Sequence, residues 1–239
     1  MMTEQSVFLA LPAYGAVEPE MMFAVLDAVT RIRRGLTIRA RKGGPISLLA
    51  RNFNQLWCKA LNHRREWGLT HFLMLHGDVV PEPGWVLTML DEMDRLQADV
   101  LSAIVPIKDH RNLTSTAILN SHAAPFTEPT KLSVRDLAGL PLSFDASAFP
   151  GNTLLANTGL LLVDFTKPWV ENVWFEIDDR ILRDPDGTFR VWTLPEDWNF
   201  SLQAAEQGAR VFVTQILSLG HFGRHYWYLE SPDKDQAAA

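Results

Sequence analysis

The sequence predicts an α/β fold in which a mostly parallel sheet is flanked by helices. In roughly the first 105 residues, short apolar segments alternate with segments whose apolar residues recur at helical spacing. From about residue 106 the chain becomes rich in Pro, Ser, Thr and small residues, which predicts an irregular, antiparallel second half. Residues 1–239 contain neither an internal repeat nor a long linker, so we expect one domain, with halves at 1–105 and 106–239.

The first half is expected to contain four strands and three helices. Short apolar runs bounded by turn residues predict strands at residues 6–11, 36–40, 71–75 and 99–105. Helical spacing predicts helices at residues 18–33, 47–67 and 84–96, with Gly35 ending the first and Ser47 capping the second. The first helix should bury a face made of Met22, Val25, Leu26, Val29 and Ile32. The third should bury Val86, Leu87, Leu90 and Met93.

The second half is expected to return to regular structure after a region of hairpins and loops at residues 108–149. A strand is predicted at residues 157–164 and a helix at 168–175, followed by a clear turn at 184–187. A helix at residues 196–208 and a strand at 210–214 complete the expected elements.

Composition excludes several classes of protein. Hydrophobic residues make up 47% of the chain and charged residues 21%, as in ordinary globular proteins. The net charge of −6 argues against a nucleic-acid partner, although residues 31–42 form a local basic cluster. We interpret that cluster as a solvated helix end and strand, with a patch for an anionic partner as the alternative.

The expected location is the cytoplasm. A single cysteine, Cys58, rules out an internal disulfide, and its apolar helical surroundings predict a buried, inert thiol. The first residues lack the pattern of a signal peptide, and no apolar run approaches the ~18 residues of a transmembrane helix.

The most informative segment is residues 71–85, HFLMLHGDVVPEPGW, in which a buried strand stops at His76-Gly77-Asp78. Ligands of open α/β sheets bind just beyond the carboxyl ends of such strands. His76 and Asp78 lie two residues apart, so an extended chain can direct both to one spot, and imidazole with carboxylate suits a divalent cation. The alternative is that both residues merely cap a loop.

Two further polar clusters lie later in the chain. Glu196 and Asp197 open a predicted helix, where acidic residues satisfy free backbone N–H groups and favour the helix dipole. A carboxylate in such a place is also a candidate general base. His221 lies between Gly220 and Phe222-Gly223, and flanking glycines allow the backbone to approach a ligand closely. A surface or core histidine is the alternative.

The order and spacing of these clusters resemble the GT-A class of glycosyltransferases, near its large inverting family. The resemblance covers residues 7 to about 222. It implies a Rossmann-related sheet that binds a nucleotide-sugar in the first half and an acceptor in the second. Pro12, Ala13 and Tyr14 resemble the nucleotide-contacting turn, and Arg51 and Asn54 belong to a segment similar to a helix near the nucleotide. Asn157, Thr158 and Gly159 resemble the strand that borders the donor sugar.

The same resemblance implies the roles of the polar clusters. His76-Gly77-Asp78 stands where the class has its Asp-any-Asp metal motif, Glu196-Asp197-Trp198 resembles the start of the catalytic helix, and His221 matches a late metal-binding histidine. Asp78 and His221, with His76 as a third ligand, would hold a divalent ion. Asp197 would be the base, and Glu196 would orient the acceptor or take the place of Asp197 as base. Because His76 replaces an aspartate, Mn²⁺ is expected rather than Mg²⁺. His76 contacting the nucleotide instead, and metal independence, stay open.

The expected function is therefore transfer of a sugar from a nucleoside-diphosphate sugar to an acceptor hydroxyl. One base and direct attack imply inversion at the anomeric carbon, with retention as the alternative. Trp85, Trp192 and Trp198 are candidates for stacking on sugar rings, although core packing is the commoner use of tryptophan. The competing functions are a non-catalytic nucleotide- or carbohydrate-binding protein, a nucleotidyltransferase and a metallohydrolase. A nucleotidyltransferase would carry a basic, Gly-rich loop where residues 12–18 have neither Lys nor Arg.

Overall fold

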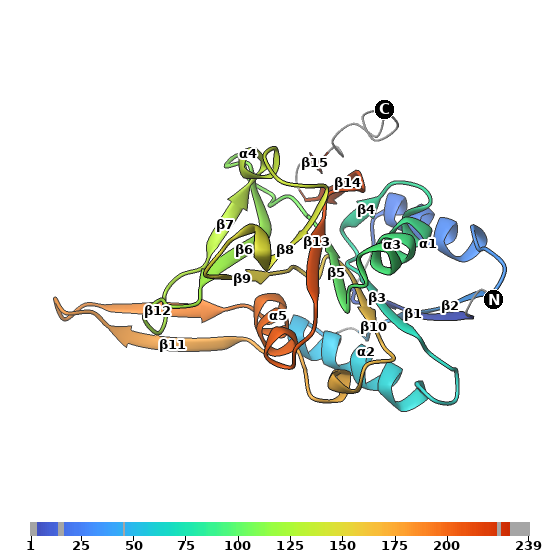
Figure 1. Cartoon of the computed structure of the whole chain (residues 1–239), viewed down its shortest axis with the longest axis horizontal. Helices are drawn as coiled ribbons and strands as arrows, with labels where there is room; N and C mark the ends of the chain where they lie inside the picture. The colour runs from blue at the N-terminus through green and yellow to red at the C-terminus, as the bar shows by residue number, and fades with distance from the viewer. Residues whose placement is uncertain (1–3, 14–16, 45, 224–225, 230–239) are drawn as a thin grey trace.

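A computed structural model describes residues 4–13, 17–44, 46–223 and 226–229. Its centre is a seven-stranded sheet with the order β2-β1-β3-β10-β5-β13-β8 (Figure 1). The strands of this sheet are β1 (Gln5–Leu11), β2 (Leu36–Lys42), β3 (His71–Leu75), β5 (Val100–Ala103), β8 (Ser143–Asp145), β10 (Leu160–Asp164) and β13 (Val211–Thr214).

Most strands of the central sheet run in one direction. β1 is parallel to β2 and β3, and β13 is parallel to β5. β10 lies between β3 and β5 and is antiparallel to both, so β3 and β5 themselves point the same way. β8, at the edge, is antiparallel to β13. Because only β10 and β8 are reversed, the α/β fold with a mostly parallel sheet is confirmed.

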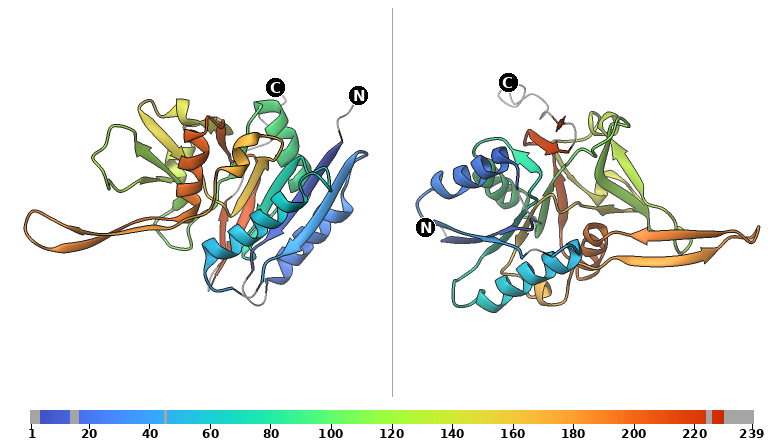
Figure 2. Two further views of the ribbon diagram at one scale, coloured as in Figure 1. Left: turned by 90° about the horizontal axis from the view of Figure 1, so that it is seen from below. Right: turned by 180° about the vertical axis from the view of Figure 1, so that it is seen from behind.

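Helices cover both faces of the sheet (Figure 2). α2 (Leu49–His63) and α5 (Glu196–Glu206) pack on one face, and α1 (Pro19–Thr30) and α3 (Trp85–Leu96) pack on the other. The two faces follow from the alternation along the strands: Phe72 and Met74 of β3 face α2 and α5, whereas Leu73 and Leu75 face α1 and α3.

Smaller antiparallel sheets are built mainly from the second half, as the change in composition predicted, with β4 added from the first half. β7 (Thr130–Ser133), β6 (Leu113–Asn120) and β9 (Asn152–Leu155) form one, and β15 (Tyr226–Leu229), β14 (Leu219–Phe222) and β4 (Val79–Pro81) form another. β11 (Asp178–Arg183) and β12 (Phe189–Leu194) make a hairpin that projects from the body (Figure 1). The helix α4 (Val134–Leu137) and the 3₁₀ turns η1 (Ala146–Ala148) and η2 (Pro168–Glu171) complete the fold.

The predicted buried face of the first helix is wrong in most of its positions. α1 buries Met21, Ala24, Val25 and Ala28, whereas Met22, Leu26, Val29 and Ile32 are exposed. Apolar residues occur around the whole circumference of α1, so their spacing alone does not indicate which face of the helix is buried. The small side chains of Ala24 and Ala28 allow a close approach to the structure beneath, and the Ala24 carbonyl accepts a hydrogen bond from the Trp85 indole at 3.0 Å.

Other expectations also needed correction. Cys58 is exposed rather than buried. α2 begins at Leu49 and ends at His63, without a side-chain cap at its start, so Ser47 is not its N-cap. The helix expected at 168–175 shortens to η2, and the strands on either side of the turn at 184–187 were not foreseen. Within the described part of the chain, no helix is long and apolar enough to cross a bilayer.

The core on the α2 side is built around Trp57. Its ring lies edge-on to Phe72, Phe165, Phe175 and Phe200, with centroids 4.7–5.8 Å apart. Its indole N–H donates to the Val170 carbonyl at 3.1 Å. One side chain therefore joins α2, β3, α5 and the segment after β10.

We expect Trp57→Ala to lower the free energy of unfolding by about 3–5 kcal/mol, because it leaves a large cavity and an unpaired buried carbonyl. Chemical denaturation measures the change. Trp174→Ala is the matched control: its ring is half exposed, and a loss below about 0.5 kcal/mol is expected. Equal losses in the two variants would contradict this account of the core.

Candidate functional site

A cavity of about 280 Å³ opens at the carboxyl ends of β1 and β3. Its lining comprises Pro12, Ala13, Glu18, Leu49, His76, Gly77 and Asp78. β1 and β3 are parallel neighbours, so the residues that follow them meet at one edge of the sheet. A Cβ placed on Gly77 would lie 3.4 Å from the Ala13 Cβ, which shows how closely the two loops approach. Five predicted site residues are thus brought together; Tyr14 lies outside the described residues.

Asp78 faces two basic side chains across this cavity edge. β14 pairs with β4 so that His221 lies opposite Val79, and the Phe222 N–H donates to the Asp78 carbonyl at 2.7 Å. His221 Nε2 lies 3.5 Å from Asp78 Oδ2, and the Lys108 ammonium donates a hydrogen bond to the same oxygen. Partial burial pushes the pKa of Asp78 upward, but the hydrogen bonds from His221 and Lys108 outweigh it and hold the pKa well below its usual range.

Asp78 and His221 could together contribute two ligands to a divalent ion. His221 Nδ1 lies 2.7 Å from the Pro106 carbonyl, so Nδ1 carries a hydrogen, and Nε2, which faces Asp78, is the ring nitrogen that could bind an ion. Metal-binding histidines are commonly oriented in this way by a backbone carbonyl. An ion held here would take its remaining ligands from water or phosphate oxygens, as Mg²⁺ and similar ions do in nucleotide sites.

His76 does not complete this pair, which corrects its expected role as a third ligand. Its Nε2 lies 3.2 Å from the Thr158 hydroxyl, and its ring packs against Phe53 with centroids 5.0 Å apart. Burial lowers the pKa of His76 to about 4, so the ring is neutral. Among the residues the structure describes, no group of three or more His, Cys, Asp and Glu side chains could hold a metal ion.

Residues 156–159, which we call the bridging segment, connect this cavity edge to α5. The His76 N–H donates to the Gly159 carbonyl at 2.9 Å, and Ser201 of α5 exchanges hydrogen bonds with the backbone of Ala156. The buried amide of Asn157 donates to the Ala103 carbonyl and accepts from the Gly159 N–H, so its role is to shape the segment. A Cβ at Gly159 would lie 2.9 Å from a Val105 methyl carbon, so a larger residue would force the neighbouring side chains to shift.

Glu196 and Asp197 occupy the first turn of α5, as the sequence predicted, and no side-chain cap is formed at the start of this helix. Burial, together with the charge of Glu196, raises the pKa of Asp197 to about 7, despite a 2.8 Å hydrogen bond from the Trp198 N–H. Burial also raises the pKa of Glu196. Two partly buried carboxyl groups, one of which has a pKa near neutrality, are suited to proton transfer.

The three candidate tryptophans are packed rather than presented to a sugar. Trp198 is 6% exposed, and its indole donates to the Ser115 carbonyl at 2.9 Å. Trp192 is similarly covered and donates to Thr127, and Trp85 is fully buried. Their structural role outweighs the stacking role that the sequence left open.

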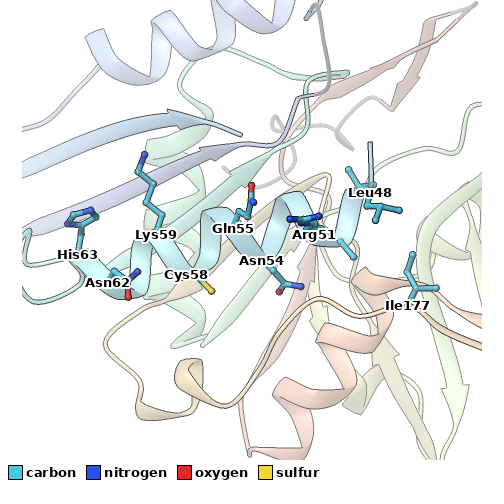
Figure 3. A pocket seen from close by; sticks show the side chains of 11 residues that line it. Leu48, Arg51, Asn54, Gln55, Cys58, Lys59, Asn62, His63 and Ile177 are labelled. Atoms are coloured by element: carbon cyan, nitrogen blue, oxygen red, sulfur yellow. The ribbon is translucent and has the colours of Figure 1, made fainter. Parts of the chain in front are cut away.

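Arg51 and Asn54 lie beside a different cavity, of about 690 Å³, along the outer side of α2 (Figure 3). Asn54 uses its amide twice on the backbone of Phe175, donating to its carbonyl and accepting from its N–H at 2.7 and 2.9 Å. Leu49 lines both cavities, so the start of α2 separates them. The structure therefore does not bring Arg51 or Asn54 into the lining of the cavity at Asp78.

Lys108 is the site residue that the sequence analysis missed. Lys108 follows β5. Because β5 points the same way as β3, the carboxyl ends of both strands lie at one edge of the sheet. A basic residue soon after a predicted buried strand was the available signal. It could have been found by the same rule that singled out Asp78.

No protein-family model and no curated protein matches this chain by sequence. Several solved structures are distantly similar. A197 from STIV is 14% identical over 96% of this chain and 95% of its own, with a TM-score of 0.44. A putative UDP-N-acetylglucosamine pyrophosphorylase from Entamoeba histolytica is 10% identical over 89% and 73%, with a TM-score of 0.40. Residues 1–349 of S. aureus TarS, in complex with UDP-GlcNAc, are 12% identical over 98% and 61%, with a TM-score of 0.40.

The raised pKa of Asp197 predicts a pH-dependent cost in stability. Between pH 3.8, the ordinary value, and about 7, the unfolded chain loses a proton that the folded chain keeps, so the free energy of unfolding falls as pH rises. We expect Asp197→Asn to be more stable than the parent protein at pH 8, by up to about 4 kcal/mol, and similar to it near pH 3.5. Urea denaturation at the two pH values measures the difference.

Asp78→Asn is the control, because it should change the free energy of unfolding at pH 8 in the opposite direction. The low pKa of Asp78 stabilises the fold above its ordinary value of 3.8, and this contribution is lost as pH falls through the folded-state pKa. The substitution should therefore destabilise the protein at pH 8. A stabilising effect of Asp78→Asn, or no effect of Asp197→Asn at pH 8, would contradict the charge assignments.

Proposed function

We propose that this protein is a glycosyltransferase that moves a sugar from a nucleoside-diphosphate sugar to an acceptor hydroxyl. The observation that carries the proposal is a pair of unlike carboxylates near the two ends of the bridging segment, which is hydrogen-bonded to His76, two residues before Asp78, and to Ser201, one helical turn after Asp197. Asp78 is held ionised beside basic groups at a strand-end cavity, and Asp197 has a pKa near 7 at the start of α5. A group that titrates near neutrality is suited to remove a proton, and a cavity edged by basic groups is suited to a diphosphate.

The donor would bind with its diphosphate toward Asp78, Lys108 and His221. Pro12, Ala13 and Gly77 line the adjoining cavity and would contact the nucleotide. Ionised Asp197 would accept the proton of the acceptor hydroxyl while the hydroxyl oxygen forms its bond to the anomeric carbon. The bond from that carbon to the diphosphate breaks, and the nucleoside diphosphate leaves with the electron pair. Direct attack of this kind inverts the anomeric carbon.

The predicted divalent ion, with Mn²⁺ favoured over Mg²⁺, belongs to the same proposal. Asp78 and His221 would hold it, and when bound it would offset the negative charge that grows on the leaving diphosphate. His76 would instead position Thr158 and Gly159, with which it is hydrogen-bonded. Glu196 would keep the pKa of Asp197 high by its nearby charge.

A non-catalytic binding protein and a nucleotidyltransferase are the alternatives that an activity screen separates. Release of a nucleoside diphosphate from nucleotide-sugars supports transfer. Binding of the same compounds without turnover would favour the binding protein. Formation of pyrophosphate from a nucleoside triphosphate and a sugar phosphate would favour the nucleotidyltransferase.

Asp197→Asn should reduce transfer by about 10²–10⁴-fold, because the acceptor would lose its general base. Donor binding should stay within about twofold, since Asp197 lies on α5 rather than in the lining of the donor cavity. Nucleoside diphosphate release measures the first quantity and calorimetry the second. Asp145→Asn, at the distant edge strand β8, is the control and should keep full activity. Full activity of Asp197→Asn would remove the assigned role.

The rate should also rise with pH through neutrality. Asp197 acts only when ionised, so kcat/KM is expected to increase tenfold per pH unit below about 7 and to level off above it. Glu196→Gln removes a neighbouring negative charge and should move this midpoint to lower pH. A profile that is flat from pH 5 to 8, with transfer as the slow step, would contradict proton removal by Asp197.

A further inference from the structure

Lys108 occupies the place beside Asp78 where a metal ion would be expected to bind. Its ammonium donates to Asp78 Oδ2, the same oxygen that lies 3.5 Å from His221 Nε2. An ion shared by Asp78 and His221 would have to approach this oxygen. The ammonium and a divalent ion therefore compete for one carboxylate in the free protein.

The backbone around Lys108 is anchored by hydrogen bonds. The Ile107 N–H donates to the Leu113 carbonyl at 2.8 Å, and Pro106 forms a β-bridge with Thr114. The Pro106 carbonyl also receives the hydrogen bond from His221. Lys108 is thus attached to the same small framework that orients His221, which distinguishes it from a lysine on a loose surface loop.

The charges at the site change in a simple way when an ion binds. Asp78 and Lys108 neutralise one another in the free protein. A divalent ion on Asp78 displaces the ammonium and leaves a net charge of about +2 from the ion, Lys108 and Asp78 together. A diphosphate carries the opposite charge, and a displaced ammonium with three N–H donors is well suited to bind its oxygens.

We propose that Lys108 is a diphosphate-binding residue that competes with the metal ion for Asp78 in the free protein and binds the phosphates once the ion has displaced it. The proposal rests on the proposed function only for the class of ligand, a diphosphate. It assigns Lys108 two effects of opposite direction, one on the free protein and one on the complex.

The test compares Lys108→Met with the parent protein in two titrations. In the first, Mn²⁺ is titrated into the free protein and followed by the electron paramagnetic resonance signal of unbound Mn²⁺. Lys108→Met should bind Mn²⁺ at least threefold more tightly, because the competing ammonium is gone. In the second, pyrophosphate is titrated as its equimolar Mn²⁺ complex by calorimetry. Lys108→Met should bind this complex at least tenfold more weakly, because a charge-assisted contact is lost.

Two further variants make the result specific. Lys108→Arg should restore most of the affinity for Mn²⁺–pyrophosphate, since it keeps the charge and the donors. Lys59→Met removes an exposed lysine on α2 and should change neither titration. Thermal unfolding of each variant establishes that it is folded before it is titrated.

Unchanged or tighter binding of Mn²⁺–pyrophosphate by Lys108→Met would overturn the diphosphate role. Unchanged or weaker binding of Mn²⁺ would overturn the competition. Neither titration involves a sugar or an acceptor. If both results are as expected while nucleotide-sugars give no transfer, the proposed function fails and the role of Lys108 stands.

Discussion

The antiparallel insertion of β10 between β3 and β5 is the constraint on which the site depends. β10 is hydrogen-bonded on both sides, and its direction is opposite to that of its neighbours. Its amino end therefore lies at the sheet edge where β3 and β5 have their carboxyl ends. The bridging segment, which precedes β10, is delivered to His76 at this edge and reaches α5 through Ser201. With β10 parallel instead, these residues would lie at the far edge of the sheet.

The site separates two carboxylates by their surroundings. Asp78 and Asp197 have the same ordinary pKa, and burial raises both. At Asp78, His221 and Lys108 outweigh burial and lower the pKa. At Asp197, the carboxylate of Glu196 raises the pKa further. Asp78 is therefore ionised at every physiological pH and Asp197 exchanges its proton near neutrality. Different surroundings that separate the pKa values of two chemically identical groups are a common way for one protein to give them different roles.

Local sequence patterns predicted the parts of the site that depend on a strand ending at the sheet edge. Gly77 and Asp78 could be placed at the sheet edge because they follow an apolar run, whereas Pro12 was assigned to the site by the family resemblance. The orientation of His76 could not be predicted, because it is set by Thr158, which lies 82 residues away and reaches it only through the insertion of β10. The buried face of α1 also escaped prediction, since apolar residues surround the helix and only packing on the sheet selects among them.

The projecting hairpin has a mechanical consequence for the start of α5. β12 ends at Leu194 and α5 begins at Glu196, so Pro195, whose φ angle is fixed by its ring, is the only residue between them. The base of the hairpin therefore lies directly before Glu196 and Asp197 in the chain. Trp192 and Leu194 of β12 and Trp198 of α5 pack in one apolar cluster, which holds the base of the hairpin against the helix. A force on the outer end of the hairpin would therefore act on this apolar cluster before it acted on Asp197.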